Sequence, residues 1–319
     1  MAVYKLQPAC KDYLWGGRRL ITHYKKETTL DILAETWELS CYPDAPSVIA
    51  DGPYAGKPLS ALIEEEGKTR ILGTRGGAFE DFPVLVKFID AAKPLSIQVH
   101  PDDAYAKAHG EPFGKNEMWY ILHAEPDAFL YLGFRKEITE ADFRARIADQ
   151  TLTDVLNRVP VHPGDSFFIK AGTLHAIGAG ITLAEIQQNS NATYRVFDYG
   201  RTDKDGNTRP LHVEQALAVT KRVPYEPQTD AYPHVAVCPS FTVDRLYLDG
   251  GRLSRAGGTA DDVSFLHLLV TDGEGTLRTD DGTVPFRKGD SLFITAGTGD
   301  YAIDGTCDIL FTESRGQVP

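Results

Sequence analysis

The chain has 319 residues, a formal net charge of −12 and a sequence pI near 5.2, with 42% hydrophobic and 24% charged residues. An acidic chain without a basic cluster is not expected to bind the phosphate backbone of a nucleic acid. No apolar run approaches the roughly 18 residues of a membrane-spanning helix, and the N-terminal sequence lacks the layout of a signal peptide. We therefore expect a soluble cytoplasmic protein that does not bind membranes, with a length that favours two domains. The cysteines lie far apart without a CxxC pair, which favours reduced thiols: Cys10, Cys41, Cys238 and Cys307.

Short apolar segments separated by 29 glycines and 19 prolines favour β-structure. In the first part of the chain, strands are predicted at 83–89, 95–100, 118–123, 128–132, 165–170, 181–187 and 194–199. In the second part, they are predicted at 241–248, 264–270, 275–279, 290–294 and 307–312. The predicted helices are 58–66, 139–158 and 212–221, and Thr139 with Asp142 resembles a capping box. Residues 222–234, with three prolines, are predicted to connect two halves of the chain.

Two stretches of the chain are near-copies of each other. Residues 164–173 (GDSFFIKAGT) and 289–298 (GDSLFITAGT) are identical at eight of ten positions. An internal repeat of this kind indicates one structural unit used twice. The first copy continues to His175, where the second has Asp300. A histidine in one copy alone predicts that a single unit carries a metal or proton-transfer site.

The segment LSIQVH at 95–100 has an alternating pattern. Side chains alternate between the two faces of a strand, so Ser96, Gln98 and His100 are expected on one face. With Glu117 and His175, His100 offers ligand types that suit Zn²⁺ or a similar divalent ion. Gln98 could add a carbonyl oxygen. The alternative is an ordinary amphipathic strand whose polar face meets solvent.

The repeat resembles the second motif of the cupins, a glycine followed by PxGxxH. In this chain Gly164 and His175 keep their places, while Lys170 replaces the usual proline. The first cupin motif has HxH and then a glutamate, and here Gln98 stands at the first histidine. The resemblance implies a mainly β protein of two cupin (jelly-roll β-barrel) units with a few inserted helices. We expect a metal-binding domain at 1–225 and a second cupin domain without metal ligands at 226–319.

A closer resemblance, along most of the chain, is to the type I mannose-6-phosphate isomerases of the short bacterial form. The segments that carry it are YLWG at 13–16, AETW at 34–37, LSIQVHPDD at 95–103, GKNEMW at 114–119, AGTLHA at 171–176 and LAEIQQNSNATYRVFDYGR at 183–201. This family consists of zinc-dependent aldose–ketose isomerases that interconvert mannose 6-phosphate and fructose 6-phosphate. The resemblance implies one Zn²⁺ per chain, a sugar phosphate as substrate, and a monomer or homodimer.

The resemblance also implies roles for single residues. The metal ligands would be His100, Glu117, His175 and, at the weakest match, Gln98. The catalytic residues would be Arg195, Glu185 and Lys115. The phosphate contacts would be Ser96, Lys87 and Arg201, the last standing where longer members have a lysine. Longer members also have a tyrosine where this chain has Ile177.

Other interpretations remain open from the sequence. A cupin dioxygenase would bind Fe or Cu, although such sites usually supply more histidines than this chain offers. A non-catalytic sugar-phosphate-binding bicupin is the alternative from another class. For single residues, Lys87 could extend from a strand edge towards solvent, Lys115 could be a loop lysine, and Glu185 could pair with a surface lysine. The histidines without motif support are expected in surface or hydrogen-bonded roles: His109, His123, His162, His212, His234 and His267.

Overall fold

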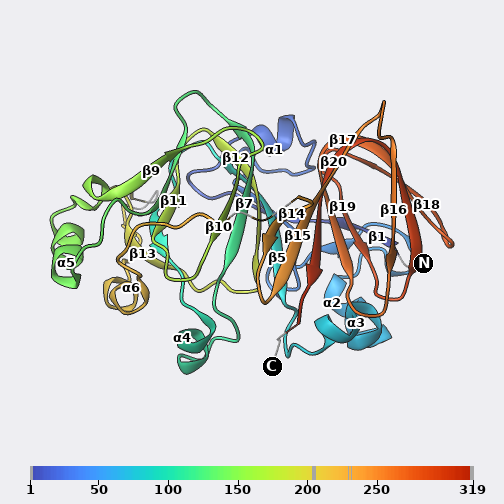
Figure 1. Ribbon diagram of the computed structural model, residues 1–319, viewed down its shortest axis with the longest axis horizontal. Coiled ribbons are helices and arrows are strands. Elements are labelled where there is room, and N and C mark those ends of the chain that lie inside the picture. Colours follow the sequence, from blue (N-terminus) through green and yellow to red (C-terminus); the bar gives the residue numbers. More distant parts are fainter. Residues whose placement is uncertain (1–2, 203–205, 229, 231, 317–319) are drawn as a thin grey trace.

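The computed structural model describes residues 3–202, 206–228, 230 and 232–316, and within them the chain is mainly β-structure (Figure 1). The helices are α1 (Arg19–Thr22), α2 (Leu59–Glu66), α3 (Lys68–Gly77), α4 (Asp103–Ala108), α5 (Glu140–Ala148) and α6 (Val213–Val219). Short 3-10 turns cover Gly52–Tyr54 and Leu152–Asp154. None of these helices combines the length and the apolar character that crossing a bilayer requires.

Two sheets form the part of the molecule that carries the candidate site, on the left in Figure 1. The first has the order β10 (Ser166–Ile169), β7 (Glu117–Ala124), β12 (Ile181–Gln188), β5 (Val84–Ala91), β3 (Glu35–Leu39) and β2 (Ala9–Lys11). The second has the order β13 (Tyr194–Phe197), β6 (Ile97–Val99), β11 (His175–Ile177), β8 (Phe129–Phe134) and β9 (Leu156–Pro160). We call them the six-stranded and the five-stranded sheet.

A nine-stranded sheet forms the other half of the molecule. Its path is β14 (His234–Val237), β15 (Phe241–Asp249), β20 (Gly299–Ser314), β17 (Leu266–Thr279), β19 (Ser291–Ile294), β1 (Val3–Gln7) and β4 (Val48–Ile49). Strand β16 (Arg255–Ala260) pairs with β20, and β18 (Gly282–Arg287) pairs with β17. The predicted mainly β fold is confirmed, but in the described part of the chain the three sheets follow open pairing paths and do not close into barrels.

The faces of the two site sheets have different neighbours. The five-stranded sheet packs Ile97, Val99 and Val196 in one apolar cluster with residues of α5 and α6. The six-stranded sheet packs Val86 and Phe88 in a cluster that reaches Phe293 and Leu310 of the nine-stranded sheet. The remaining faces of the two site sheets share a third cluster and are turned towards each other. Side chains on these inner faces form the candidate site.

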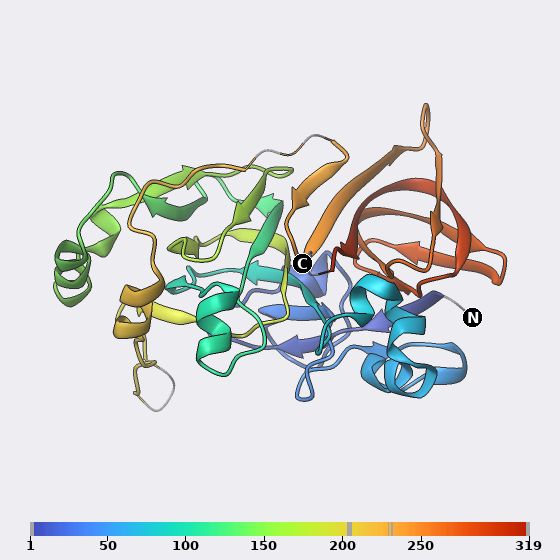
Figure 2. The same ribbon diagram turned by 60° about the horizontal axis from the view of Figure 1, so that its bottom comes forward.

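The N-terminal segment contributes to the nine-stranded sheet. Strand β1 pairs with β19, for example Val3 with Ile294. Helices α2 and α3 lie against the same half of the molecule in both ribbon views (Figure 2). There Gly73 has a φ of +76° and a Cβ on it would meet the backbone of Val263 at 2.5 Å. The boundary expected at 225 and 226 stays a prediction, and these contacts tie the beginning of the chain to the predicted second unit.

The two copies of the repeat have the same backbone conformation. Gly164 and Gly289 begin them with φ values of +94° and +91°. Strands β10 and β19 follow, and the next glycines, Gly172 and Gly297, have φ values of +84° and +72°. These left-handed conformations favour glycine at all these positions, which explains why the repeat keeps them.

Some predicted elements differ from the structure. The helix expected at 139–158 ends at Ala148, because Gln150 has a positive φ of 57° and the chain then forms strand β9. Its N-terminus is as predicted, since Thr139 Oγ1 accepts a hydrogen bond of 3.1 Å from the Asp142 amide. The strands expected at 264–270 and 275–279 form one strand, β17, with a bulge between Val270 and Asp272. Helices α1, α3 and α4 were not predicted.

Candidate active site

A row of charged and aromatic side chains crosses the inner face of the six-stranded sheet. Lys87 on β5 is in register with Trp37 on β3 and with Glu185 on β12. Glu185 is in register with Trp119 on β7, and the Trp119 indole donates a hydrogen bond of 2.8 Å to Glu185 Oε2. Residues directly opposite on neighbouring strands point to the same face. The sheet therefore presents Lys87 and Glu185 side by side.

The five-stranded sheet supplies the opposite wall. Gln98 on β6 is in register with His175 on β11 and with Arg195 on β13. Ser96 and Gln98 line the cavity, whereas Ile97 and Val99 are fully buried on the other face. The predicted alternation of this segment is confirmed, and its polar face meets a cavity instead of open solvent.

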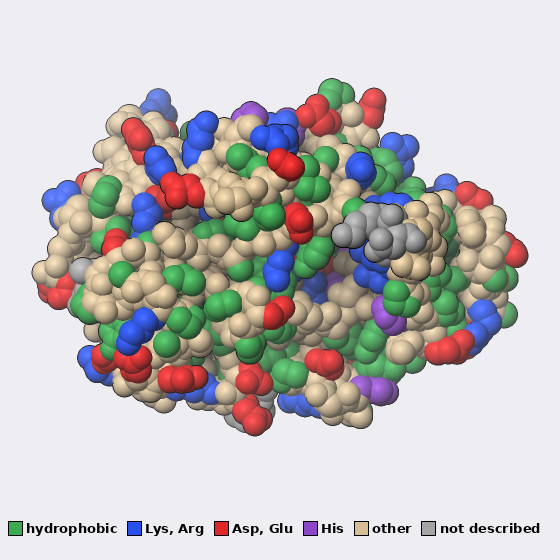
Figure 3. Space-filling view, turned by 180° about the vertical axis from the view of Figure 1, so that it is seen from behind, with side chains coloured by type: hydrophobic (Ala, Val, Ile, Leu, Met, Phe, Trp, Pro, Cys, Tyr) green, Lys and Arg blue, Asp and Glu red, His purple; other side chains and the backbone are tan. Residues whose placement is uncertain are grey.

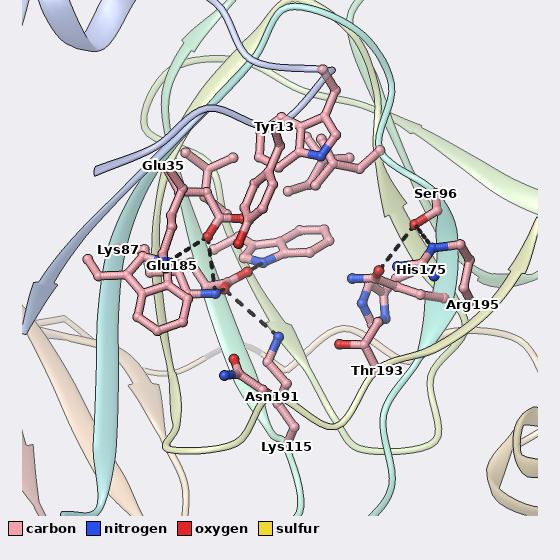
Figure 4. Close-up of a pocket in the computed structure, with 18 of the residues that line it drawn as sticks. Tyr13, Glu35, Lys87, Ser96, Lys115, His175, Glu185, Asn191, Thr193 and Arg195 are labelled. Carbon is pink, nitrogen blue, oxygen red and sulfur yellow. Dashed lines mark hydrogen bonds and ion pairs between the residues drawn. The ribbon is translucent and has the colours of Figure 1, made fainter. Parts of the chain in front are cut away.

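Between the walls lies a cavity of about 420 Å³, shown in Figure 4. In that view Lys87, Glu35 and Glu185 are on one side, and Ser96, His175 and Arg195 are on the other. The residues that line the cavity are Lys11, Tyr13, Trp15, Glu35, Trp37, Asp44, Lys87, Ile89, Leu95, Ser96, Gln98, Lys115, Trp119, His175, Ile177, Glu185, Asn191, Thr193, Arg195 and Arg209.

His100, Glu117 and His175 form a buried group with ligand atoms within 4.8 Å of one another. The Nδ1 atoms of His100 and His175 lie 2.8 Å from the carbonyl oxygens of Ala192 and Thr173. Only a protonated Nδ1 can donate to a carbonyl, so each neutral ring has its lone pair on Nε2. Carbonyl acceptors hold metal-binding histidines in this way. Both Nε2 atoms face Glu117, at 3.6 Å for His100 and 3.3 Å for His175.

The charges of this group favour a cation. Burial lowers the pKa of His175 to about 4 and that of His100 well below its usual value, so both rings are neutral. Burial also raises the pKa of the Glu117 carboxyl, with Lys115 opposing the shift. His175 Nε2 and Glu117 Oε1 are fully buried without a hydrogen-bond partner. Unsatisfied buried acceptors are costly, and a divalent ion would satisfy both. The residues present therefore fit a metal.

Gln98 remains the least defined of the predicted ligands. It lies opposite His175 in the strand register, and its Oε1 is 3.4 Å from the hydroxyl of Ser96. The carbonyl oxygen thus faces the cavity beside a predicted ligand. Its coordination stays a prediction.

Buried lysines and glutamates alternate along the six-stranded sheet. Lys115 Nζ is 2.7 Å from Glu117 Oε2 and 3.9 Å from Glu185 Oε1. Lys87 Nζ is 3.1 Å from Glu185 Oε1 and 3.6 Å from Glu35 Oε2. Burial alone would raise the pKa of Glu185, but Lys115 and Lys87 lower it below its usual range. Burial alone would lower the pKa of Lys87, but Glu35 and Glu185 raise it. Three carboxyl groups, those of Glu35, Glu117 and Glu185, therefore lie against the amino groups of Lys87 and Lys115.

Arg195 and Arg201 occupy different surroundings. Arg195 Nε donates a hydrogen bond of 3.2 Å to Ser96 Oγ, and its Nη1 donates one of 3.2 Å to the carbonyl of Pro210. Arg201 bonds to Asp198 and to the carbonyl of Pro94, and it lines a smaller neighbouring cavity of about 260 Å³. The structure thus brings all the predicted site residues except Arg201 to the main cavity or to the metal group beneath it.

The sequence reasoning missed several residues of the cavity. Glu35 and Trp119 lie within segments that carried the family resemblance, so their motifs held a usable signal. Asn191 and Thr193 lie in the run 183–201, which also carries the resemblance. Arg209 had no such signal, because it reaches the cavity from a loop outside every recognised motif.

These features define a cupin-type enzyme with a metal-ligand group at the base of a polar cavity. Residues 3–128 match the family described as "Phosphomannose isomerase type I, catalytic domain", and residues 233–313 match "Mannose-6-phosphate isomerase, cupin domain". The chain belongs to the type I mannose-6-phosphate isomerases and is an isomerase of that family.

Individual relatives agree with this assignment. The chain is 33% identical to mannose-6-phosphate isomerase ManA of Bacillus subtilis over 311 residues, 95% of this chain and 96% of that protein. It is 33% identical to the Streptococcus mutans mannose-6-phosphate isomerase over 318 residues, 97% and 98% of the two chains. The crystal structure of the Bacillus subtilis mannose 6-phosphate isomerase matches with a TM-score of 0.86 and 32% identity over 98% of this chain and 99% of that one. A mannose 6-phosphate isomerase bound with zinc and yttrium shares the fold, with a TM-score of 0.75 and 20% identity over 99% and 100%.

Proposed function

We propose that the protein interconverts mannose 6-phosphate and fructose 6-phosphate with one Zn²⁺ at His100, Glu117 and His175. The observation that carries the proposal is the buried ligand group, whose two imidazoles are held by backbone carbonyls with Nε2 facing Glu117. The identity of the substrate is proposed from the names of the relatives described above. The identity of the ion is proposed from the zinc-bound structure that shares the fold. Gln98 is the proposed fourth ligand.

The proposed ion would act on the oxygens of the substrate. Zn²⁺ in such a site orients substrate oxygens and polarises a carbonyl. Everything else in the reaction falls to the side chains of the cavity, which place the sugar and move its protons.

The conversion of an aldose to a ketose moves one proton from C2 to C1 and another from the C2 hydroxyl to the C1 oxygen. Such a reaction needs a group that takes and returns the carbon-bound proton and a second group that serves the oxygens. Glu185 and Lys115 are the proposed pair, since their charged atoms are 3.9 Å apart beside the metal group. Lys115 also contacts Glu117 at 2.7 Å, which couples its position to that of the ligands.

Arg195 is proposed to stabilise the negative charge that develops on the enediolate. Its guanidinium is half-buried, lines the cavity and is fixed by Ser96 and Pro210. A preorganised cation in a site with little water stabilises such charge strongly. The resemblance to the family assigned this role, and the geometry is compatible with it.

The proposed phosphate contacts have unequal support. Ser96 lines the cavity next to Arg195 and has a hydroxyl that can donate to a phosphate oxygen. Lys87 lines the cavity too, but it is already paired with Glu35 and Glu185. Arg201 would have to reach past Asp198 from the neighbouring cavity. Contact with the distant phosphate would use binding energy to position the reacting carbons.

A coupled assay of purified protein with mannose 6-phosphate tests the proposal. We expect turnover that EDTA abolishes and that added Zn²⁺ restores. Absence of turnover by the zinc-loaded protein would contradict the proposal, and retained binding of the sugar phosphate would then favour a non-catalytic bicupin. Metal-dependent consumption of O₂ without isomerisation would favour the dioxygenase alternative.

A further inference from the structure

Arg209 is a cavity residue to which neither the sequence motifs nor the proposed mechanism assigns a role. It lies in the connection between β13 and α6 and lines the main cavity together with Ser96 and Arg195. It also lines the smaller neighbouring cavity, so its side chain stands where the two spaces meet. Its side chain is 36% exposed, which places it at the mouth and not at the base.

Asp198 fixes the direction of this guanidinium. Arg209 Nε donates a hydrogen bond of 2.8 Å to Asp198 Oδ2, and Nη2 donates one of 2.6 Å to Oδ1. Such a two-point contact holds a guanidinium in one plane and one orientation. Asp198 engages only Nε and Nη2, so the Nη1 group is not used by this carboxylate. Burial would raise the pKa of Asp198, but the bonds from Arg209 and Arg201 lower it, so the carboxylate that clamps Arg209 is ionised.

The backbone beside Arg209 is tied to the strand that carries Arg195. Arg195 Nη1 donates to the carbonyl of Pro210, and the His212 amide donates a bond of 2.7 Å to the carbonyl of Arg195. The loop is therefore anchored one and three residues after Arg209. In addition to burial, the positive charge of Arg209 lowers the pKa of Arg195, as expected for two guanidiniums close together.

The two ends of the cavity differ in their charge balance. At the six-stranded sheet, Lys87 and Lys115 are matched by Glu35, Glu117 and Glu185.

Where the two cavities meet, Asp198 is a buried carboxylate beside two guanidiniums, and the guanidinium of Arg195 lines the main cavity close by. Arg201 and Arg209 both pair with Asp198. Arg195 forms no ion pair within the described residues, and its hydrogen bonds go to a hydroxyl and a carbonyl. Half-buried cations without a counter-charge are unfavourable, so this end of the cavity favours a bound anion.

We propose that Arg209, held by Asp198, binds the phosphate of the substrate at the cavity mouth together with Ser96, with Asp198 acting as a positioning residue. This inference rests on the proposed function for the identity of the substrate. The phosphate would then lie against the wall formed by the five-stranded sheet and the loop between β13 and α6. It would lie away from Lys87, which is paired with carboxylates. A guanidinium whose Nη1 group is not engaged by its carboxylate partner suits the tetrahedral oxygens of a phosphate.

Kinetics of Arg209→Ala test the assignment. We expect the KM for mannose 6-phosphate and the inhibition constant for inorganic phosphate to rise together by about tenfold to hundredfold, the range of one charge-assisted hydrogen bond. The fall in kcat should be smaller than the rise in KM. Arg209→Lys should show an intermediate rise, and Asp198→Asn should raise both constants through loss of the clamp. Arg144→Ala is the matched control, because Arg144 makes a similar two-point contact with Glu214 on the surface.

The outcome that overturns the proposal is a KM and an inhibition constant within about twofold of the parent protein in Arg209→Ala. If Arg209→Ala does not fold, Arg209→Gln, whose side chain is closer in length to arginine, serves the same comparison. Thermal unfolding and metal content are measured for every variant. Calorimetric titration with inorganic phosphate needs no turnover. If the parent protein failed to isomerise the sugar, the proposed function would fall, while loss of phosphate binding in Arg209→Ala would still support the anion site.

Discussion

Lys87 and Glu185 face each other across neighbouring strands, with Lys87 Nζ 3.1 Å from Glu185 Oε1. Lys115 approaches the same oxygen from the other side, at 3.9 Å. Both ammonium groups hold the carboxylate in its ionised form although it is buried. Glu185 is thus a fixed negative charge beside the metal group, in the position proposed for proton transfer.

Glu185→Gln preserves the shape of this side chain and removes its charge. We expect kcat to fall about 100-fold or more, since a positioned acid or base contributes 10²–10⁴-fold to a rate. Bound zinc should stay near one equivalent, because Glu185 is not among the ligand group. Glu125→Gln is the control, because Glu125 is an exposed glutamate in the turn that follows β7. A kcat within about threefold of the parent protein would refute the proton-transfer role.

His175→Ala and Asp300→Ala compare the two copies of the repeat. His175 belongs to the buried ligand group, whereas Asp300 accepts a hydrogen bond of 2.6 Å from Thr259 at an exposed position. The first substitution should abolish bound metal, measured by elemental analysis, together with most of the activity. The second should leave both nearly unchanged. Equal loss of metal in the two variants would overturn the single-site account.

Arg195→Ala separates charge stabilisation from metal binding. Within the described residues, the Arg195 guanidinium bonds to Ser96 and to the carbonyl of Pro210, and it makes no hydrogen bond to His100, Glu117 or His175. We expect kcat to fall by about 10²–10³-fold, as for loss of one group that stabilises developing negative charge, with zinc content unchanged. Arg278→Ala removes an exposed arginine paired with Asp304 and is the control. Turnover that survives within a few fold would show that the assigned role is wrong.

His267 predicts a pH dependence of stability outside the active site. It is fully buried on β17 with Nε2 2.8 Å from Ser291 Oγ, and burial lowers its pKa to about 3. The unfolded chain binds this proton near pH 6.5, so between pH 6.5 and 3 the unfolded state holds more protons and stability falls as pH falls. From pH 7 to pH 5 this histidine should cost about 2 kcal/mol of unfolding free energy.

Urea unfolding at pH 7 and pH 5 measures that loss. His267→Gln places an amide near the position of Nε2 and can keep the hydrogen bond to Ser291 without titrating, so its loss between the two pH values should be smaller by about the same 2 kcal/mol. An identical pH dependence for both proteins would mean that the pKa of His267 is not lowered in the folded state.

The metal group was accessible from the sequence because it depends on local order. His100 and Gln98 follow from alternation within one strand, and Glu117 and His175 from recognisable motifs. Strand β1 was not assigned to the nine-stranded sheet, because its partner β19 is nearly 300 residues away and no local pattern encodes the pairing. Arg209 was missed for the same kind of reason. Its place at the cavity depends on Asp198 and on bonds between its loop and β13.

The charge distribution also lay beyond the sequence. The net charge of −12 gave no indication of a surplus of guanidiniums at the cavity mouth. On the face shown in Figure 3, acidic and basic side chains are interspersed. The local balance emerges only when Arg195, Arg201 and Arg209 are brought together by folding. The predicted phosphate contact at Lys87 rested on motif position, which does not reveal the two carboxylates beside it.

Titration of metal-stripped protein with Zn²⁺ tests the central claim most directly, with conversion of mannose 6-phosphate to fructose 6-phosphate followed at each addition. We predict that activity rises with added zinc and reaches its plateau at one equivalent per chain, and that His175→Ala shows no such rise. Full activity in the stripped protein, or no conversion at any zinc concentration, would contradict the account.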